Sequence, residues 1–397
     1  MQKMLLVMNR LDLGGIEKAV VNLLNCISPT EWEIDLYLVR KEGVFLKDIP
    51  KNVNVYEIIM PEYIRTMILL PTRAALKESL QHGKVIAAGK ILGNYLKRYG
   101  GDMNRNMEVY FEEYDRCIPM LEKRYDVAID YQGQGSFPTY YVAQKVMAEN
   151  KISWIHNDFS VVDDSLRWLD ELYGKFNKIV SVSRKAEKAF VEKFPNKSAY
   201  SYVCYNIVPK KQICRLANEY EIPRTGEVII TTVGRLCYQK GYDMALNVLK
   251  KIKDQGQLFK YYIVGDGTDY CNLQKQVKRL GLEKYVVFTG FQNNPYPYIK
   301  VCDIYFQPSR FEGFCITLTE AKILGKAIVT TDFAGADEQI IDGKTGLIIA
   351  AREDEMYQAL VRVLTDEHLK NTLEKNVCEQ NINNDAIDQF YRLVEER

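Results

Sequence analysis

The sequence predicts an α/β protein made of two doubly wound, Rossmann-like parallel-sheet domains with a cleft between them. Short apolar runs that end in Gly, Asn, Asp or Ser recur along the whole chain, and helical patterns separate them, as in parallel sheets flanked by helices. The second half of the chain repeats the scheme of the first. A chain of 397 residues is also too long for one ordinary hydrophobic core. Two domains of similar size are therefore expected.

The apolar runs place the strands, because each run is short and bounded by turn residues. In the first half, strands are expected at Lys3–Asn9, Ile34–Val39, Val53–Ile59, Asp126–Asp130, Ile152–His156, Ile179–Val182 and Tyr200–Cys204. In the second half, they are expected at Val228–Val233, Tyr261–Val264, Val286–Thr289, Ile304–Gln307, Ala327–Thr330 and Leu347–Ile349.

The hinge between the domains is expected at Tyr205–Pro209, and Lys210–Thr225 is expected to be a polar connector. The first domain then covers residues 1–205 and the second covers residues 206–380. Residues 381–397 form a final segment. Its apolar residues follow the spacing i, i+3, i+4, i+7, which predicts an amphipathic helix from Asp385 to Arg397: Ile387, Phe390, Tyr391 and Val394.

Composition limits the partners and the location. With 53 Lys and Arg against 52 Asp and Glu, the formal net charge is +1, which gives no global attraction to nucleic acid. The nine cysteines are odd in number and never spaced as C-x-x-C, so they indicate neither a disulfide framework nor a zinc site and fit a reducing cytosol. The first apolar run is too short for a signal peptide, and no run approaches a membrane span. A cytoplasmic protein, soluble or peripheral on a membrane, is expected.

One segment, residues 63–105, departs from the alternation because basic and apolar residues are interspersed in it. A helical hairpin with apolar and cationic faces would lie on an anionic bilayer. A solvated helical insertion that packs on its own domain is the alternative. The basic residues are Arg65, Arg73, Lys77, Lys84, Lys90, Lys97, Arg98 and Arg105, against the acidic residues Glu78 and Asp102.

Two glutamates eight positions apart, Glu312 and Glu320, lie on either side of a glycine turn. In one continuous helix such positions differ by about 12 Å along the axis and about 80° around it, so both could not contact one small ligand. Glu312 is therefore expected in a loop and Glu320 in the first turns of the following helix. The N–H groups of Gly313, Phe314 and Cys315 would then be free to bind an anion. This layout is typical of a nucleotide-sugar pocket.

A loop with two cations between glycines follows the first strand of the second domain. Arg235 offers a planar fork of donors and Lys240 a mobile point charge, while the glycines allow close backbone approach. A diphosphate suits this pair of cations, and two surface cations near a turn are the alternative interpretation. Gly265 ends the next strand, where ligands of doubly wound sheets bind. A tight turn alone would also explain Gly265.

In the first domain, Gly14 and Gly15 follow the first strand and open a helix whose N–H groups could approach a phosphate or sugar hydroxyls. The motif is neither G-x-G-x-x-G nor a Walker loop, which disfavours NAD and ATP. His156 lies at a strand end, and for it a ligand contact and a structural role are equally open. No D-x-D occurs, so no metal and no cofactor are expected. Arg235 and Lys240 would then supply the positive charge.

Taken together, these motifs resemble the retaining glycosyltransferases of family 4, which have the two-domain GT-B fold and include bacterial surface-polysaccharide enzymes. The resemblance covers most of the chain, and the ordered set is specific although each motif alone is weak. The matching residues are Gly14-Gly15, His156, Ser181–Arg184, Asn206 with Pro209, Gly234–Leu236 with Gln239–Gly241, Gly265–Gly267, Pro308–Ser309, Glu312 and Glu320 with Gly313, Ala327–Asp332, Gly335, Glu338, and Asp342–Gly343 with Gly346.

The resemblance implies a nucleotide-sugar donor, with UDP favoured, held mainly by the second domain. Arg235 and Lys240 would bind the diphosphate, and Glu320 would bind the ribose. Glu312 and the Gly313–Cys315 backbone would contact the donor sugar and phosphate. Retention of configuration, an acceptor side lined by Gly14 and Gly15, and a final helix that crosses back onto the first domain are also implied. The implied catalytic residues are Glu312, His156, Arg235 and Lys240, and the implied donor-binding residues are Gly14, Gly15, Arg235, Lys240, Gly265, Gly313, Phe314, Cys315 and Glu320.

The predicted function is transfer of one sugar to a growing surface glycan, on a polyprenyl-diphosphate carrier at the inner face of the cell membrane. Three alternatives are a catalytically inactive GT-B subunit that binds a partner, a sugar-nucleotide epimerase, and a glycosidase with Glu312 and Glu320 as acid and base. A glycosidase would not need the diphosphate-binding cations. For the nucleotide base, Tyr305 and Tyr296-Pro297-Tyr298 could provide stacking or could pack in the core.

Overall fold

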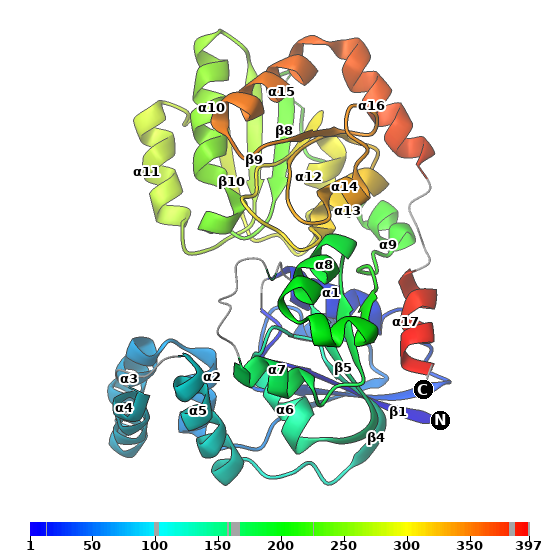
Figure 1. Ribbon diagram of the computed structural model, residues 1–397. Helices are drawn as coiled ribbons and strands as arrows, with labels where there is room; N and C mark the ends of the chain where they lie inside the picture. Colours follow the sequence, from blue (N-terminus) through cyan, green and yellow to red (C-terminus); the bar gives the residue numbers. More distant parts are fainter. Residues whose placement is uncertain are drawn as a thin grey trace. The chain divides into compact units, whose positions relative to one another are not determined.

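The computed structural model describes residues 1–12, 14–98, 103–156, 159, 167–224, 226–380 and 386–395 (Figure 1). It divides into two compact units. The first comprises Met1–Val182, Ala186–Cys204 and Ile387–Arg397, and the second comprises Ser183–Lys185 and Tyr205–Ala386. Parts of three predicted segments lie outside the described residues: 99–102 and the side chains of 103–105 in the basic segment, 225 in the connector, and 381–385 and 396–397 in the final segment.

The first unit contains a seven-stranded parallel sheet in the order β3-β2-β1-β4-β5-β6-β7. The central strands are buried, and in β1 every residue from Met4 to Met8 is inaccessible to solvent. Strands buried on both faces read as continuous apolar runs, which is why the sequence located them. The strands are β1 (Gln2–Met8), β2 (Trp32–Leu38), β3 (Val53–Glu57), β4 (Arg124–Asp130), β5 (Met147–Ile155), β6 (Lys178–Ser181) and β7 (Ser201–Val203).

The basic segment forms short helices that pack on the first unit's core through residues such as Ile64 and Ile91. Residues 72–81 and 85–98 form two helices that pack against each other, as in the expected hairpin, and a further short helix precedes them. Pro71 precedes the third helix of the unit, and Gly83, with a φ of 68°, follows that helix, so the chain turns at both residues. The helices of this unit are α1 (Gly15–Leu24), α2 (Glu62–Leu69), α3 (Thr72–Gln81), α4 (Val85–Arg98), α5 (Met103–Cys117), α6 (Phe137–Lys145), α7 (Arg167–Tyr173) and α8 (Arg184–Lys193), with 3₁₀ turns at Leu46–Asp48 and Pro195–Tyr200.

Helix α17 (Ala386–Glu395) belongs to the first unit although it ends the chain (Figure 1). Phe390 is fully buried, and its ring centroid lies 6.0 Å from that of Trp154. The backbone N–H of Ser28 donates to the Tyr391 hydroxyl at 2.8 Å. Lys178 Nζ donates to the carbonyl of Leu393 at 2.7 Å. This contact places a cation at the carboxyl end of α17, where it interacts favourably with the helix dipole. The amphipathic pattern of this segment therefore serves packing against the first sheet.

The second unit contains a six-stranded parallel sheet in the order β10-β9-β8-β11-β12-β13. Residues 210–216, expected as part of a polar connector, instead form helix α9 (Lys210–Leu216), because Ile213 packs in a buried apolar cluster. The strands are β8 (Val228–Val233), β9 (Phe259–Val264), β10 (Val286–Gly290), β11 (Ile304–Gln307), β12 (Ala327–Thr331) and β13 (Leu347–Ile349).

Helices cover both faces of this second sheet. One buried cluster joins the sheet to α10, α11 and α15, and another joins it to α9, α12 and α13. The remaining helices of the unit are α10 (Tyr242–Asp254), α11 (Tyr270–Leu280), α12 (Tyr296–Val301), α13 (Ile316–Ile323), α14 (Ala336–Gln339), α15 (Glu353–Thr365) and α16 (Glu367–Glu379), with a 3₁₀ turn η4 at Tyr238–Lys240.

Candidate functional site

The predicted donor-site residues of the second unit gather where its strand order reverses. Strands β8 and β11 are parallel neighbours, with Ile304 paired to Ile230. The chain leaves β8 toward α10 on one face and leaves β11 toward α13 on the other face. The carboxyl ends of two such strands open a crevice in which doubly wound sheets bind ligands. The loops after β8 and β11 carry Lys240 and Glu312.

Lys240 and Glu312 form an ion pair across these two loops. Lys240 Nζ lies 2.6 Å from Glu312 Oε1, and the side chains are only 15% and 9% exposed. Burial opposes protonation of Lys240, but the neighbouring Glu312 carboxylate outweighs it and holds the pKa of Lys240 above its ordinary value. The crevice therefore contains a buried ammonium group that stays charged at neutral pH.

A chain of buried hydrogen bonds fixes the Glu312 carboxylate. Ser309 Oγ donates to Glu312 Oε1 at 2.8 Å, and Gln307 Nε2 donates to Ser309 Oγ at 2.8 Å. The Tyr305 hydroxyl donates to Gln307 Oε1 at 3.0 Å. From the other loop, Gln239 Nε2 donates to Glu312 Oε2 at 3.4 Å. The carboxylate thus accepts hydrogen bonds from both loops, and its direction is set before any ligand binds.

Arg310 ties the loop after β11 to the start of α10. Its guanidinium makes two hydrogen bonds of 2.7 Å to the Asp243 carboxylate and lies 3.9 Å from the ring centroid of Tyr238. This paired geometry is the strong form of a charge-assisted hydrogen bond. Burial would raise the pKa of Asp243, but the hydrogen bonds from Arg310 lower it below its ordinary value. The contact braces the loop that bears Lys240.

Arg235 lies in the same β8 loop with its side chain exposed. Among the described residues, no carboxylate forms an ion pair with its guanidinium. Gly265, from the neighbouring loop, supports this position: a Cβ there would lie 2.1 Å from the carbonyl oxygen of Gly234. The backbone N–H of Leu236 also donates to the carbonyl of Asp266 at 2.9 Å. Close packing of the two loops therefore accounts for glycine at position 265.

Gly313, Phe314 and Cys315 lead from Glu312 into helix α13. Cys315 has a φ of 60° and a ψ of 80° immediately before the helix begins. Within the described part of the chain, the backbone N–H groups of Phe314 and Cys315 have no hydrogen-bond partner. Burial is the largest cause that raises the pKa of the Cys315 thiol, to about 11, so it is neutral at physiological pH. The two N–H groups are available to an anion at the start of α13.

Glu320 lies in the second turn of α13, as the spacing argument expected, and Glu312 lies in the preceding loop. The Glu320 side chain is buried, and the Tyr296 hydroxyl donates to its Oε1 at 3.1 Å. Tyr296 and Tyr305 are themselves buried, so they fill the interior in this structure. Tyr298 packs against another ring, with its centroid 5.5 Å from that of Tyr262. These contacts favour the packing interpretation of the three tyrosines over base stacking.

In the first unit, His156 directly follows β5 and is 6% exposed. Burial lowers the pKa of His156 to about 3, although the backbone carbonyl of Tyr131 accepts a hydrogen bond from the imidazole. The ring is therefore neutral at physiological pH. In the part of the chain described, Nε2 has no hydrogen-bond partner. Since the other ring nitrogen carries the proton, Nε2 is an acceptor suited to a hydroxyl group.

Gly14 and Gly15 open helix α1 at the carboxyl end of β1. Gly14 has an extended backbone, with a φ of −175°, which any residue could adopt. Among the described residues, the atoms nearest to a Cβ at Gly14 belong to the carboxylate end of the Glu17 side chain, and a Cβ at Gly15 would meet nothing within 4 Å. Packing inside the first unit therefore does not require glycine at either position, and open space beside Gly15 suits a ligand.

The loop after β4 was not singled out from the sequence. Asp130 is fully buried, and burial raises its pKa to about 6. Its carboxylate accepts hydrogen bonds from the Gly133 N–H at 2.9 Å and from Ser153 Oγ at 2.8 Å. Gly133, Gln134 and Gly135 all have positive φ, at 65°, 53° and 68°. The signal available in the sequence was Gly-Gln-Gly, which begins three positions after the last residue of a predicted strand.

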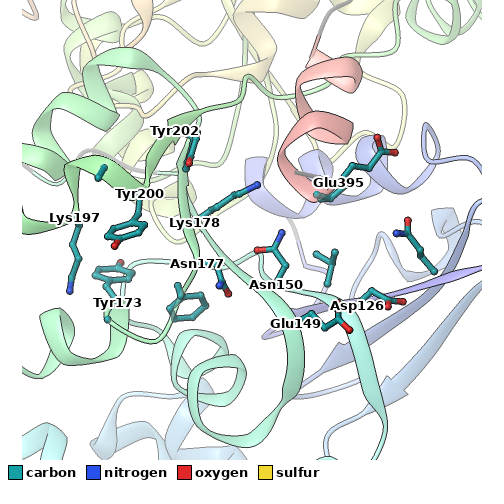
Figure 2. A pocket seen from close by; sticks show the side chains of 16 residues that line it. Asp126, Glu149, Asn150, Tyr173, Asn177, Lys178, Lys197, Tyr200, Tyr202 and Glu395 are labelled. Atoms are coloured by element: carbon teal, nitrogen blue, oxygen red, sulfur yellow. The ribbon is translucent and has the colours of Figure 1, made fainter. Parts of the chain in front are cut away.

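A groove of about 780 Å³ lies at the opposite, amino edge of the first sheet (Figure 2). In Figure 2, Asn150, Asn177 and Lys178 project into the region between Tyr200 and Glu395. The groove is lined by the starts of β1, β4, β5 and β6 and by the end of α17. The predicted site residues do not line this groove.

Metal-binding clusters and membrane-spanning helices are both absent from the described ranges. No cluster of three or more His, Cys, Asp or Glu side chains there is placed to hold a metal ion. Likewise, no helix in those ranges is both long and apolar enough to cross a bilayer.

Comparison with known proteins gives a family match within the second unit. Residues 218–380 match the family described as Glycosyl transferases group 1. The chain is 30% identical over 222 residues to the N-acetylgalactosamine-N,N'-diacetylbacillosaminyl-diphospho-undecaprenol 4-alpha-N-acetylgalactosaminyltransferase of Campylobacter jejuni, covering 55% of this chain and 59% of that protein. It is 28% identical over 159 residues to the O-antigen biosynthesis glycosyltransferase WclY of Escherichia coli, covering 40% and 44%. The matches thus span about half the length of these curated relatives.

Among solved structures, the chain is similar to Anabaena Alr3699/HepE in complex with UDP and glucose. The TM-score is 0.71 at 18% sequence identity, and the similarity covers 100% of both chains. At this identity the similarity shows the fold alone. The predicted GT-B class, with two parallel Rossmann-like sheets, is confirmed.

Proposed function

We propose that this chain is a glycosyltransferase that moves a sugar from a nucleotide-diphosphate donor to a glycan or lipid-linked glycan acceptor in surface polysaccharide synthesis. The observation that carries the proposal is the buried Lys240 ammonium, 2.6 Å from Glu312 at the strand-order reversal. Both residues lie inside the stretch that matches the group 1 family. The loop of Glu312 also contains the N–H groups of Phe314 and Cys315, which have no hydrogen-bond partner among the described residues. A cation with nearby amide donors suits a diphosphate.

The proposed chemistry is stabilisation of the leaving group. As the bond between the sugar and the donor phosphate breaks, negative charge grows on the nucleoside diphosphate. Lys240, Arg235 and the two loop N–H groups would hold this charge, each charge-assisted hydrogen bond being worth about 1.5–3 kcal/mol. Because the ion pair and the Arg310 brace fix the loops beforehand, little reorganisation accompanies the reaction. We assign this role to Arg235 and Lys240 in place of a metal ion.

The other predicted residues receive roles from their surroundings. Glu320, buried beside Tyr296, would accept hydrogen bonds from the ribose hydroxyls. The neutral imidazole of His156 would accept a hydrogen bond from a hydroxyl of the transferred sugar through Nε2. The Gly14-Gly15 turn would line the acceptor side, where its open space admits a hydroxyl-rich ligand. Retention of configuration is proposed from the resemblance to family 4.

The choice of donor and acceptor draws on the named similar proteins. UDP appears in the name of the Anabaena complex, which supports UDP as the nucleotide. The acceptor in the name of the Campylobacter protein is a diphospho-undecaprenol glycan, which supports a polyprenyl-diphosphate acceptor here.

Incubation of the purified protein with UDP-, GDP- or ADP-sugars and a bacterial lipid extract is expected to release nucleoside diphosphate. Mass spectrometry should show a lipid-linked acceptor heavier by one sugar, and NMR should show the donor's anomeric configuration in the product. The reaction should persist in EDTA, because the proposed positive charge comes from Arg235 and Lys240. Nucleotide binding without release would favour the inactive subunit, and conversion of the donor to an epimer would favour the epimerase.

Peripheral membrane attachment is a second part of the proposal, carried by helix α4. Its buried face includes Ile91, whereas the opposite face exposes four apolar side chains. From Arg73 to Arg98 inclusive, the sequence contains six Lys and Arg residues and the single acidic residue Glu78. A protruding apolar face within a basic segment fits an anionic bilayer surface. The exposed apolar residues are Val85 at 68%, Ile86 at 81%, Leu92 at 44% and Leu96 at 60%.

Combined replacement of Ile86→Ser and Leu96→Ser is expected to weaken binding to vesicles of anionic phospholipid by about tenfold. Partial burial of each side chain in the bilayer interface would contribute about 0.7 kcal/mol. Co-sedimentation at physiological salt measures the partition, and Ile341→Ser, which removes an apolar residue 50% exposed on the second unit, is the matched control. Equal binding of the wild type to anionic and neutral vesicles would contradict the attachment.

A further inference from the structure

Cys315 adopts a backbone conformation that its side chain disfavours. Its φ of 60° and ψ of 80° place it in the left-handed region, where the Cβ of an L-residue crowds the following carbonyl. Among the described residues, Gln134 is the other non-glycine with positive φ. Such a conformation persists only when surrounding contacts hold it. The loop that precedes α13 must therefore be held from outside.

Gln339, at the end of α14, supplies such a contact. Its side chain is buried, and Nε2 donates to the carbonyl of Phe314 and, at 3.3 Å, to the carbonyl of Gly335. Its Oε1 accepts a hydrogen bond from Thr319 Oγ1 at 2.7 Å. Its backbone carbonyl accepts one from Lys322 Nζ at 2.6 Å. Contacts from α13 and α14 thus fix the side chain of Gln339, which in turn holds the loop that precedes α13.

The hydrogen bond to Phe314 fixes the direction of the next N–H group. The Phe314 carbonyl and the Cys315 N–H belong to one planar trans peptide and point in opposite directions. With the carbonyl turned toward Gln339, the N–H of Cys315 is turned away from it. Over the described residues that N–H has no partner. Glutamine at position 339 therefore determines where one of the anion-binding donors points.

We propose that Gln339 is a positioning residue for the donor diphosphate, acting through the Phe314–Cys315 peptide. It holds Cys315 in the left-handed region, and thereby keeps the Cys315 N–H directed at the phosphate oxygens. This inference rests on the proposed function, because it takes the anion to be a nucleoside diphosphate. Gln339 itself does not contact the ligand.

The test is a pair of substitutions with nucleotide affinity as the readout. Gln339→Met keeps the length and volume of the side chain but removes its hydrogen bonds, and it is expected to weaken UDP or GDP binding by about tenfold in calorimetry. Glycine adopts positive φ without crowding, so Cys315→Gly in that background should recover at least threefold of the loss. Cys315→Gly should raise the affinity more in that background than in the wild type, where Gln339 already holds the conformation. Gln276→Met is the matched control: it removes amide hydrogen bonds of 2.8 and 2.9 Å between α11 and α10, and it should leave the affinity unchanged.

The possible results distinguish failure of the positioning role of Gln339 from failure of the proposed function. Wild-type affinity in a folded Gln339→Met protein would overturn the positioning role, and so would equal effects of Cys315→Gly in both backgrounds. A wild-type protein that binds neither UDP nor GDP would overturn the proposed function and, with it, this role. If Gln339→Met does not fold, Thr319→Val takes its place, because it removes only the hydroxyl that donates to the side-chain amide of Gln339. A twofold to threefold weaker affinity is then expected, and unchanged affinity would overturn the proposal.

Discussion

Replacing Lys240 by alanine is expected to lower turnover by one to two orders of magnitude. The loss corresponds to one charge-assisted hydrogen bond to the leaving diphosphate, about 1.5–3 kcal/mol, at about 1.4 kcal/mol for each tenfold change in rate. The same substitution leaves Glu312, 2.6 Å away in the wild type, without its counter-ion. The unpaired negative charge of Glu312 would then repel the phosphates of the donor, so the affinity for nucleotide should fall as well. Steady-state kinetics at saturating donor, together with calorimetry for UDP or GDP, separates the two effects.

Lys275→Ala is the matched control for this experiment. Lys275 lies exposed on α11 in the same unit, so its removal changes the net charge equally but touches neither loop. Turnover of this variant should stay within twofold of the wild type. Near-normal turnover in Lys240→Ala would remove the diphosphate clamp, provided that circular dichroism shows the variant to be folded.

Much of the fold could be predicted from the sequence because parallel strands are buried on both faces. Strand β8 and strand β11 were each expected at the bounds that the structure gives them. Their burial makes them continuous apolar runs, and such runs are easy to find. The basic segment was harder, since its apolar residues are divided among several short helices. The turns at Pro71 and Gly83 were the available signals, and they outweighed the overall amphipathic pattern.

At the candidate site, spacing located the charged residues but not what holds them. The eight-residue separation of Glu312 and Glu320 was enough to divide them between loop and helix. Ser309 and Gln307 could not be assigned to Glu312 in the same way, because their contact depends on how the loop folds back on β11. Gln339 is separated from Phe314 by 25 positions. Long-range contacts of this kind leave no local periodicity for sequence reasoning to detect.

Replacing Glu312 by glutamine is expected to lower the alkaline pH at which activity is lost, relative to the wild type. In the wild type, burial disfavours the Lys240 ammonium, but the Glu312 charge more than offsets it and raises the pKa of Lys240. Glutamine keeps the size of the side chain and the hydrogen bond from Ser309, but it removes the charge. Without that charge the effect of burial is less opposed, and the pKa of Lys240 should fall below its value in the wild type. A pH profile of kcat/KM from pH 6 to pH 10 measures the shift, because kcat/KM reports the pKa values of the free enzyme.

The pH dependence of the stability of the Glu312→Gln variant independently tests the direction of the Lys240 pKa shift. The raised pKa of Lys240 means that the ion pair stabilises the fold below the ordinary pKa of lysine, and that this contribution is lost as pH rises through the folded value. Breaking a largely buried pair should cost about 3 kcal/mol at neutral pH, and the difference in free energy of unfolding should shrink toward pH 11. Glu283→Gln, at an exposed position on the second unit, should show neither effect. A Glu312→Gln variant whose pH profile and stability both follow the wild type would mean that the Lys240 charge does not depend on Glu312, and the crevice would lose the feature that marks it as a diphosphate site.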